Sequence, residues 1–165
     1  VRNDEVSGSI PLSSTIPAVS MPNSLQNSPV TASCHCGAVE FTLAAAPDTV
    51  VECNCSLCRR YGVRWAYYDI DEIAGLPGPD QTHAYAWNGR HVDFHRCRTC
   101  GCVTHWAPRA KGRRTLGINA RLLPEDAVAG ARLRHKDGAG TGGFSTSARS
   151  CRPSCGARHA RSPRR

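Results

Sequence analysis

Three clusters of closely spaced cysteines constrain this chain of 165 residues more than any other feature. They read C-x-C-G at residues 34–37, C-x-C-x-x-C at residues 53–58 and C-x-x-C-G-C at residues 97–102. The first residues lack the basic and apolar segments of a secretory signal, which predicts a reducing, cytoplasmic compartment. Cysteine pairs on tight turns are typical of zinc ligands, so the spacing favours metal ligation over disulfides or a redox pair.

The outer two clusters together offer one complete set of ligands. Four thiolates close a structural zinc site. The pair Cys34 and Cys36 with the pair Cys97 and Cys100 would make such a site. Because these pairs lie far apart in the sequence, a metal shared between them would staple the fold.

The middle cluster offers a set of three. Cys53, Cys55 and Cys58 would leave one coordination position of a zinc ion free for water or a substrate thiol. The same spacing also allows one or two purely structural zinc ions, with Cys102 or a histidine completing the second site. Both alternatives stay open on spacing alone.

The chain around these clusters is patterned for short β-strands. Val39, Phe41 and Leu43 alternate with polar residues, which predicts a half-buried strand. Asn88-Gly89 between two apolar runs predicts a hairpin, because both positions tolerate positive φ. Further strands are expected at residues 49–53, 65–70, 103–106 and 115–119, a loop or single helical turn at 55–62, and a short helix at 124–129. The fold class is therefore expected to be mainly β.

The two ends of the chain differ from its middle. Residues 1–31 read as a flexible leader, 32–134 as the folded domain, and 135–165 as a basic, disordered tail in which Cys151 and Cys155 have no assigned site. The net charge is +8, and nearly all of the excess lies beyond residue 131. Nucleic acid is therefore expected to make only nonspecific contacts with the tail. No apolar run is long enough to cross a membrane, and no feature specifies an oligomeric state.

At these residues the chain resembles the glutathione-dependent formaldehyde-activating enzyme family, whose domain is shared with centromere protein V. The matching stretches are SCHCGAVEF (33–41), CNCSLCRRYG (53–62), WAYY (65–68) and FHRCRTCGCVTHW (94–106), and INARLL (118–123) looks like the family's late strand. Members usually continue past the late helix into one more ordered segment with an aromatic residue. This chain instead passes into an Arg/Ser/Gly-rich tail.

The resemblance implies a β-tent fold, in which small antiparallel sheets are held by a structural zinc. It implies two zinc ions per chain. The implied structural ligands are Cys34, Cys36, Cys97 and Cys100, and the implied ligands of a catalytic zinc are Cys53, Cys55 and Cys58. The implied activity is that of a carbon–sulfur lyase similar to S-(hydroxymethyl)glutathione synthase, with glutathione and formaldehyde as small-molecule partners.

The chemistry of glutathione adds four candidate binding residues. Its two carboxylates require cations, and Arg59 and Arg60 directly follow the middle cluster. Trp65 and Tyr67 would wall the pocket, although aromatic residues on a strand also commonly form core. Another thiol or aldehyde would fit the same pattern. The alternative function is a non-catalytic zinc-binding module for protein or nucleic-acid interaction.

Overall fold

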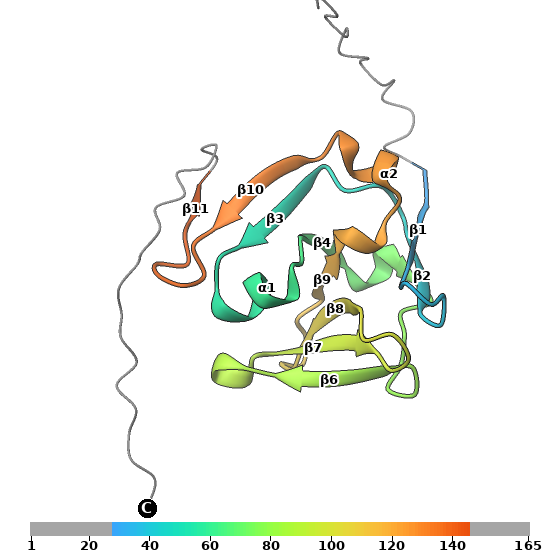
Figure 1. Cartoon of the computed structure of the whole chain (residues 1–165), viewed down its shortest axis with the longest axis horizontal. Coiled ribbons are helices and arrows are strands. Elements are labelled where there is room, and N and C mark those ends of the chain that lie inside the picture. The colour runs from blue at the N-terminus through green and yellow to red at the C-terminus, as the bar shows by residue number, and fades with distance from the viewer. Residues whose placement is uncertain (1–27, 146–165) are drawn as a thin grey trace, which may run out of the picture.

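A computed structural model describes residues 28–145 as two β-sheets with short connecting helices (Figure 1). This confirms the expected mainly β fold class. The smaller sheet has the order β1 (Val30–Ser33), β2 (Glu40–Leu43), β5 (Ile73–Ala74). The larger sheet has the order β11 (Phe144–Ser145), β10 (Arg132–Lys136), β3 (Thr49–Cys53), β4 (Trp65–Asp69), β9 (Thr115–Asn119), β8 (Val103–Pro108), β7 (Val92–Cys97), β6 (Thr82–Ala86). The helices are α1 (Ser56–Tyr61) and α2 (Glu125–Ala129), with 3-10 turns at Ile70–Glu72, Asn88–Arg90 and Ala120–Leu122.

Most neighbouring strands run antiparallel, as expected, and the exception lies beside the middle cysteine cluster. Strand β10 pairs with β3 in parallel, in a register that sets Lys136 opposite Cys53. On its other side β3 meets β4 at a single pair, Val51 with Trp65. Figure 1 shows β10 running alongside β3, with α1 below them. The end of β3 is thus enclosed by an element from late in the chain.

The hairpin predicted at Asn88-Gly89 is confirmed. Strands β6 and β7 pair antiparallel around it. The backbone turns through positive φ at Asn88 (45°), Gly89 (71°) and Arg90 (53°). Asparagine and glycine adopt this region at low cost, which explains why the sequence signal was reliable.

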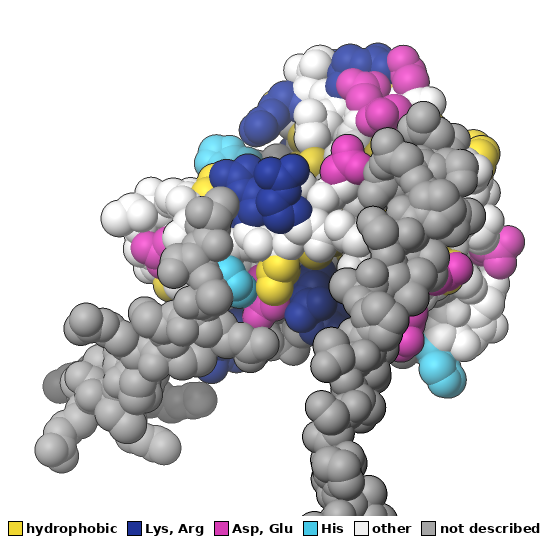
Figure 2. Space-filling view, turned by 90° about the horizontal axis from the view of Figure 1, so that it is seen from above, with side chains coloured by type: hydrophobic (Ala, Val, Ile, Leu, Met, Phe, Trp, Pro, Cys, Tyr) yellow, Lys and Arg dark blue, Asp and Glu magenta, His cyan; other side chains and the backbone are white. Residues whose placement is uncertain are grey.

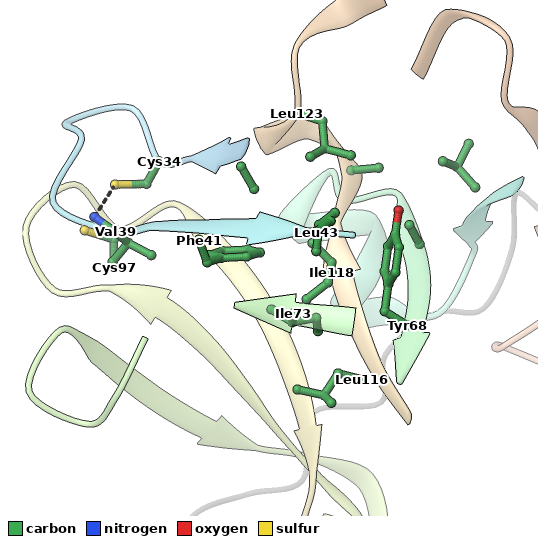
Figure 3. Close-up of a cluster of buried hydrophobic side chains, with 14 residues drawn as sticks. Cys34, Val39, Phe41, Leu43, Tyr68, Ile73, Cys97, Leu116, Ile118 and Leu123 are labelled. Carbon is green, nitrogen blue, oxygen red and sulfur yellow. Dashed lines mark hydrogen bonds between the residues drawn. The ribbon is translucent and has the colours of Figure 1, made fainter. Parts of the chain in front are cut away.

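The main core lies between the smaller sheet and the middle of the larger one (Figure 3). Phe41 and Leu43 of β2 point inward and pack in one cluster with Leu116 and Ile118 of β9. Leu43 and Ile118 are completely buried. Figure 3 shows Cys34 and Cys97 at one end of this cluster, so the outer cysteine clusters border the core.

The described strands extend beyond residue 134, the expected end of the folded domain. Strand β10 continues to Lys136, and the turn 137–143 leads into β11, which contains Phe144. This part of the expected tail is therefore folded, and it supplies an ordered segment with an aromatic residue. Cys151 and Cys155 lie outside the described residues, as do residues 1–27. None of the helices at residues 28–145 has the length and apolar character needed to cross a bilayer.

Candidate functional site

The outer cysteine clusters meet at one end of the molecule. Cys34 and Cys36 come from the turn between β1 and β2, and Cys97 and Cys100 from the turn between β7 and β8. Their four sulfur atoms lie within 4.8 Å of one another. The Sγ–Sγ distances are 3.6 Å from Cys34 to Cys36 and 3.7 Å from Cys36 to Cys97. Tetrahedral zinc with Zn–S bonds of about 2.3 Å separates its sulfurs by about 3.8 Å, so this four-cysteine group fits a closed zinc site.

Backbone conformation explains how two separate turns present their sulfurs so closely. Gly37 and Gly101 each follow a cysteine at φ 75°, and each donates its N–H to the carbonyl of the first cysteine of its turn. The Val39 N–H donates to Cys34 Sγ over 3.3 Å. Such N–H donors stabilise thiolate ligands and fix their direction. The turns are therefore shaped for metal binding by local sequence.

The middle cluster forms a second group with one ligand fewer. Cys53 ends β3, Cys55 is the N-cap of α1, and Cys58 lies in that helix. Their sulfurs lie within 4.8 Å of one another. The group contains no fourth Cys, His, Asp or Glu from residues 28–145, and Cys102 belongs to neither group. This three-cysteine group is therefore suited to a metal with one open position.

Short-range interactions orient the three-cysteine group. The Cys58 N–H donates to Cys55 Sγ over 3.4 Å, which also caps α1. Trp65 is buried, and its Nε1–H donates to Cys58 Sγ over 3.2 Å. The hydrogen bond from Cys58 lowers the pKa of Cys53 to about 5, with a smaller contribution from the charge of Lys136. The same interaction raises the pKa of Cys58. Of this pair, Cys53 is therefore the side chain in which the thiolate is favoured.

A cleft of about 770 Å³ opens beside Cys53 and Cys58. It lies where the end of α1 faces β10 and β11. Its basic lining residues are Arg59, Arg64, Arg121, His135 and Lys136, and they outnumber the two acidic ones, Glu52 and Asp137. Arg64 lies 3.4 Å from the Glu52 carboxylate. Arg59 and Arg121 form no ion pair within the part of the chain that the structure describes. Figure 2 shows patches of Lys and Arg side chains on the face seen from above, with Asp and Glu side chains among them. The cleft is therefore suited to an anion.

Of the four predicted binding residues, the structure brings Trp65 to the three-cysteine group and Arg59 to the cleft. Arg59 lines the cleft, and the Trp65 indole contacts Cys58. Tyr67, on the same face of β4 as Trp65, is 40% exposed. Partial burial, with a contribution from the Cys53 and Cys58 charges, raises the pKa of Tyr67 to about 12.

Arg60 lies away from the cleft. Its Nη1–H donates to the Ser56 carbonyl over 2.8 Å, and its side chain lines a shallow hollow with Tyr85 and Trp87. Arg121, Lys136 and Phe144 also line the cleft, and none of them was predicted from the sequence. The glycine-rich run between Lys136 and Phe144 is a turn signal. Read as a turn, it would have indicated that the chain folds back between these two residues.

A pair of histidines lies near the main core, outside both cysteine groups; His105 is buried and His95 is half-buried. His95 and His105 stack with ring centroids 4.3 Å apart. The Nδ1 of each is 3.0 Å from a threonine hydroxyl. Burial lowers the pKa of His105 to about 3, so that side chain is neutral in the fold. These histidines have a structural role in packing.

The chain is similar to known proteins over most of its described part. Residues 29–133 match the sequence model of the family described as glutathione-dependent formaldehyde-activating enzyme. The chain is also similar to a structural genomics protein from Rhodobacter sphaeroides, with 31% identity over 58% of this chain and 93% of that one, and a TM-score of 0.49. The family match includes both cysteine groups and more than half of the sequence. The chain therefore belongs to the glutathione-dependent formaldehyde-activating enzyme family.

Proposed function

We propose that this protein is a zinc-dependent carbon–sulfur lyase that joins formaldehyde to glutathione at Cys53, Cys55 and Cys58. Membership of the family supports a glutathione-related, formaldehyde-activating function. The observation that carries the finer proposal is a three-cysteine group, without a fourth protein ligand in the described chain, at the edge of a cationic cleft. A closed group of four would have no room for a substrate thiol.

The residues of the cleft match the charges of glutathione. The tripeptide has two carboxylates, and Arg59, Arg121 and Lys136 supply cations along one cleft that reaches Cys53. Charge-assisted hydrogen bonds from arginine to carboxylate are strong and directional. Binding of the carboxylates there would hold the substrate sulfur next to the three-cysteine group. The main catalytic contribution is then proximity and orientation.

The reaction itself asks little of the protein. The glutathione sulfur forms a bond to the carbon of formaldehyde, and the carbonyl oxygen takes up the proton that the thiol loses. Zinc, when bound by the three cysteines, would lower the pKa of a thiol at the open position. Trp65 and the Cys58 N–H keep the cysteine sulfurs in place. The four-cysteine group would hold a second, structural zinc, and a reducing compartment such as the cytoplasm would keep all seven thiols available.

The experiment that tests this proposal is NMR exchange spectroscopy on glutathione and formaldehyde at equilibrium with their adduct. The zinc-loaded protein is expected to accelerate exchange, and Cys55→Ser is expected to abolish the acceleration. Cys102→Ser is the matched control, because Cys102 belongs to neither cysteine group. Failure of the wild type to accelerate exchange with two zinc ions bound would contradict the proposal and favour another substrate or a non-catalytic zinc module.

A further inference from the structure

The turn at residues 137–143 folds back against the three-cysteine group. Asn54, which lies between Cys53 and Cys55, holds it through two side-chain hydrogen bonds, and a third, backbone bond reaches the end of β10. The Asn54 backbone N–H donates to the Lys136 carbonyl over 3.1 Å. Its Nδ2–H donates to Asp137 Oδ1, and its Oδ1 accepts from the Ala139 N–H, each over 2.9 Å. One side chain therefore joins this turn to the loop that carries the ligands.

Asp137 organises the turn from inside. Its Oδ2 accepts from the Thr141 N–H over 3.0 Å, and its carbonyl accepts from the Gly142 N–H over 2.7 Å. Its own N–H donates to the Gly143 carbonyl over 2.8 Å. These bonds fix the shape of the turn, so the contacts of Asn54 fix its position.

Gly138 is the point at which the turn comes nearest to the cysteines. A Cβ atom on Gly138 would lie 2.4 Å from Cys53 Sγ and 3.2 Å from Cys55 Cβ. Gly142 in the same turn needs glycine for its φ of 75°, but Gly138 does not have positive φ. Glycine at position 138 is therefore explained by the space beside Cys53 and not by backbone conformation.

We propose that this turn is a fixed wall of the thiol site, with Asn54 as its positioning residue and Gly138 setting the space beside Cys53. The inference rests on the proposed function in so far as the three-cysteine group is where a substrate thiol binds. The wall closes the side of Cys53 at Gly138, while Asp137, Thr141 and Gly143 of the same turn line the open cleft. A thiol with a slender, anionic body extending into the cleft is accepted, and one with bulk next to its sulfur is excluded.

The test compares alkylation of Cys53 by a bulky and a small reagent, N-phenylmaleimide and iodoacetamide, in the full-length zinc-loaded protein. Cysteine-resolved mass spectrometry gives both rates. The ratio of the bulky reagent's rate to the small reagent's rate cancels changes in the thiolate population of Cys53. In Asn54→Asp, two carboxylates face each other, and the ratio is expected to rise about fivefold or more. Adding Asp137→Asn restores a donor opposite the new carboxylate, and the ratio is expected to return to within about twofold of wild type.

Each outcome of this comparison decides the proposal. An unchanged ratio in Asn54→Asp would overturn it. A raised ratio that does not return toward the wild-type value in the double variant would overturn the hydrogen bond between residues 54 and 137 as the contact that holds the turn in place. Because no catalytic turnover is measured, failure here is distinguishable from failure of the proposed reaction.

Gly138→Ala provides a second, independent measurement. Because the added methyl group cannot fit beside Cys53 Sγ if the wall is fixed, cobalt affinity of the three-cysteine group is expected to fall at least about tenfold. Gly78→Ala is the matched control, since a Cβ there meets nothing within 4 Å. Affinity within about twofold of wild type in Gly138→Ala would show that the turn yields, and would overturn the proposal.

Discussion

Replacing Trp65 with phenylalanine isolates one hydrogen bond to the three-cysteine group. Trp65 is 2% exposed, and its indole N–H reaches Cys58 Sγ at 3.2 Å. Its ring also packs against Phe94 with centroids 6.1 Å apart. Phenylalanine keeps an aromatic ring in this position but has no donor. The substitution therefore leaves the Cys58 sulfur with one donor fewer in a buried setting.

The size of the effect follows from the charge of the acceptor. A hydrogen bond to a charged group contributes about 1.5–3 kcal/mol, and each 1.4 kcal/mol changes an equilibrium constant about tenfold. The zinc affinity of the three-cysteine group is therefore expected to fall by about 10- to 100-fold in Trp65→Phe, the range typical of lost outer partners of metal ligands. The four-cysteine group does not contact Trp65 and should keep its affinity.

Competition with a chromophoric chelator measures the two affinities separately when the sites differ enough in strength. Trp106→Phe is the matched control. Trp106 packs against Tyr67 with centroids 6.0 Å apart, and no hydrogen bond joins it to a cysteine in the described chain. The Trp106→Phe variant should lose stability but keep the zinc affinities of both cysteine groups. Unchanged zinc affinity of the three-cysteine group in a folded Trp65→Phe variant would refute this account of Cys58.

The remaining predictions concern the cleft, the structural metal and the core. Arg59→Gln is expected to raise the KM for glutathione about tenfold with little change in kcat, as measured by steady-state kinetics. Arg113→Gln changes an exposed arginine outside the cleft and is expected to leave KM unchanged. Equal effects of the two substitutions on KM would contradict the cleft as the binding site. Cys97→Ser is expected to remove one zinc per chain and to lower the melting temperature, measured by metal analysis and circular dichroism, and an unchanged melting temperature would argue against a staple. Leu43→Ala is expected to lower the free energy of urea unfolding by about 2–5 kcal/mol, because Leu43 is completely buried; a loss below about 1 kcal/mol would contradict the packing described for β2. His105 has a pKa of about 3 in the fold against its ordinary 6.5, so the unfolded chain takes up its proton first as pH falls, and the stability that neutral His105 supplies above pH 6.5 is lost between pH 6.5 and 3. The free energy of urea unfolding of His105→Gln should accordingly vary less with pH in that window than that of the wild type. Parallel plots of the two free energies against pH would contradict a neutral buried His105.

Cysteine spacing and strand alternation carried most of the information about the fold. The alternating residues of β2 and the Asn88-Gly89 turn are local signals, and local contacts satisfy them. The pairs Cys34 with Cys36 and Cys97 with Cys100 were also readable, because zinc chemistry limits how separate turns can combine. These features depend on short-range geometry or on a shared metal.

The last part of the site depends on a long-range contact. Strand β10 has three basic residues, Arg132, Arg134 and Lys136, and resembles the start of a basic tail. It is held by a parallel ladder to β3, a strand far away in the sequence, and no local pattern encodes that pairing. The glycine-rich run after it suggests disorder on composition alone. The hydrogen bonds of Asp137 within the run fix its shape, and those of Asn54 fix its position.

Cadmium NMR of the metal-substituted protein tests the central claim most directly, namely one closed four-cysteine site and one open three-cysteine site. The account predicts two cadmium resonances, of which only one shifts when glutathione is added. That resonance should disappear in Cys55→Ser and persist in Cys102→Ser. A spectrum in which glutathione moves neither resonance, with both sites occupied, would contradict an open thiol-binding site at Cys53, Cys55 and Cys58.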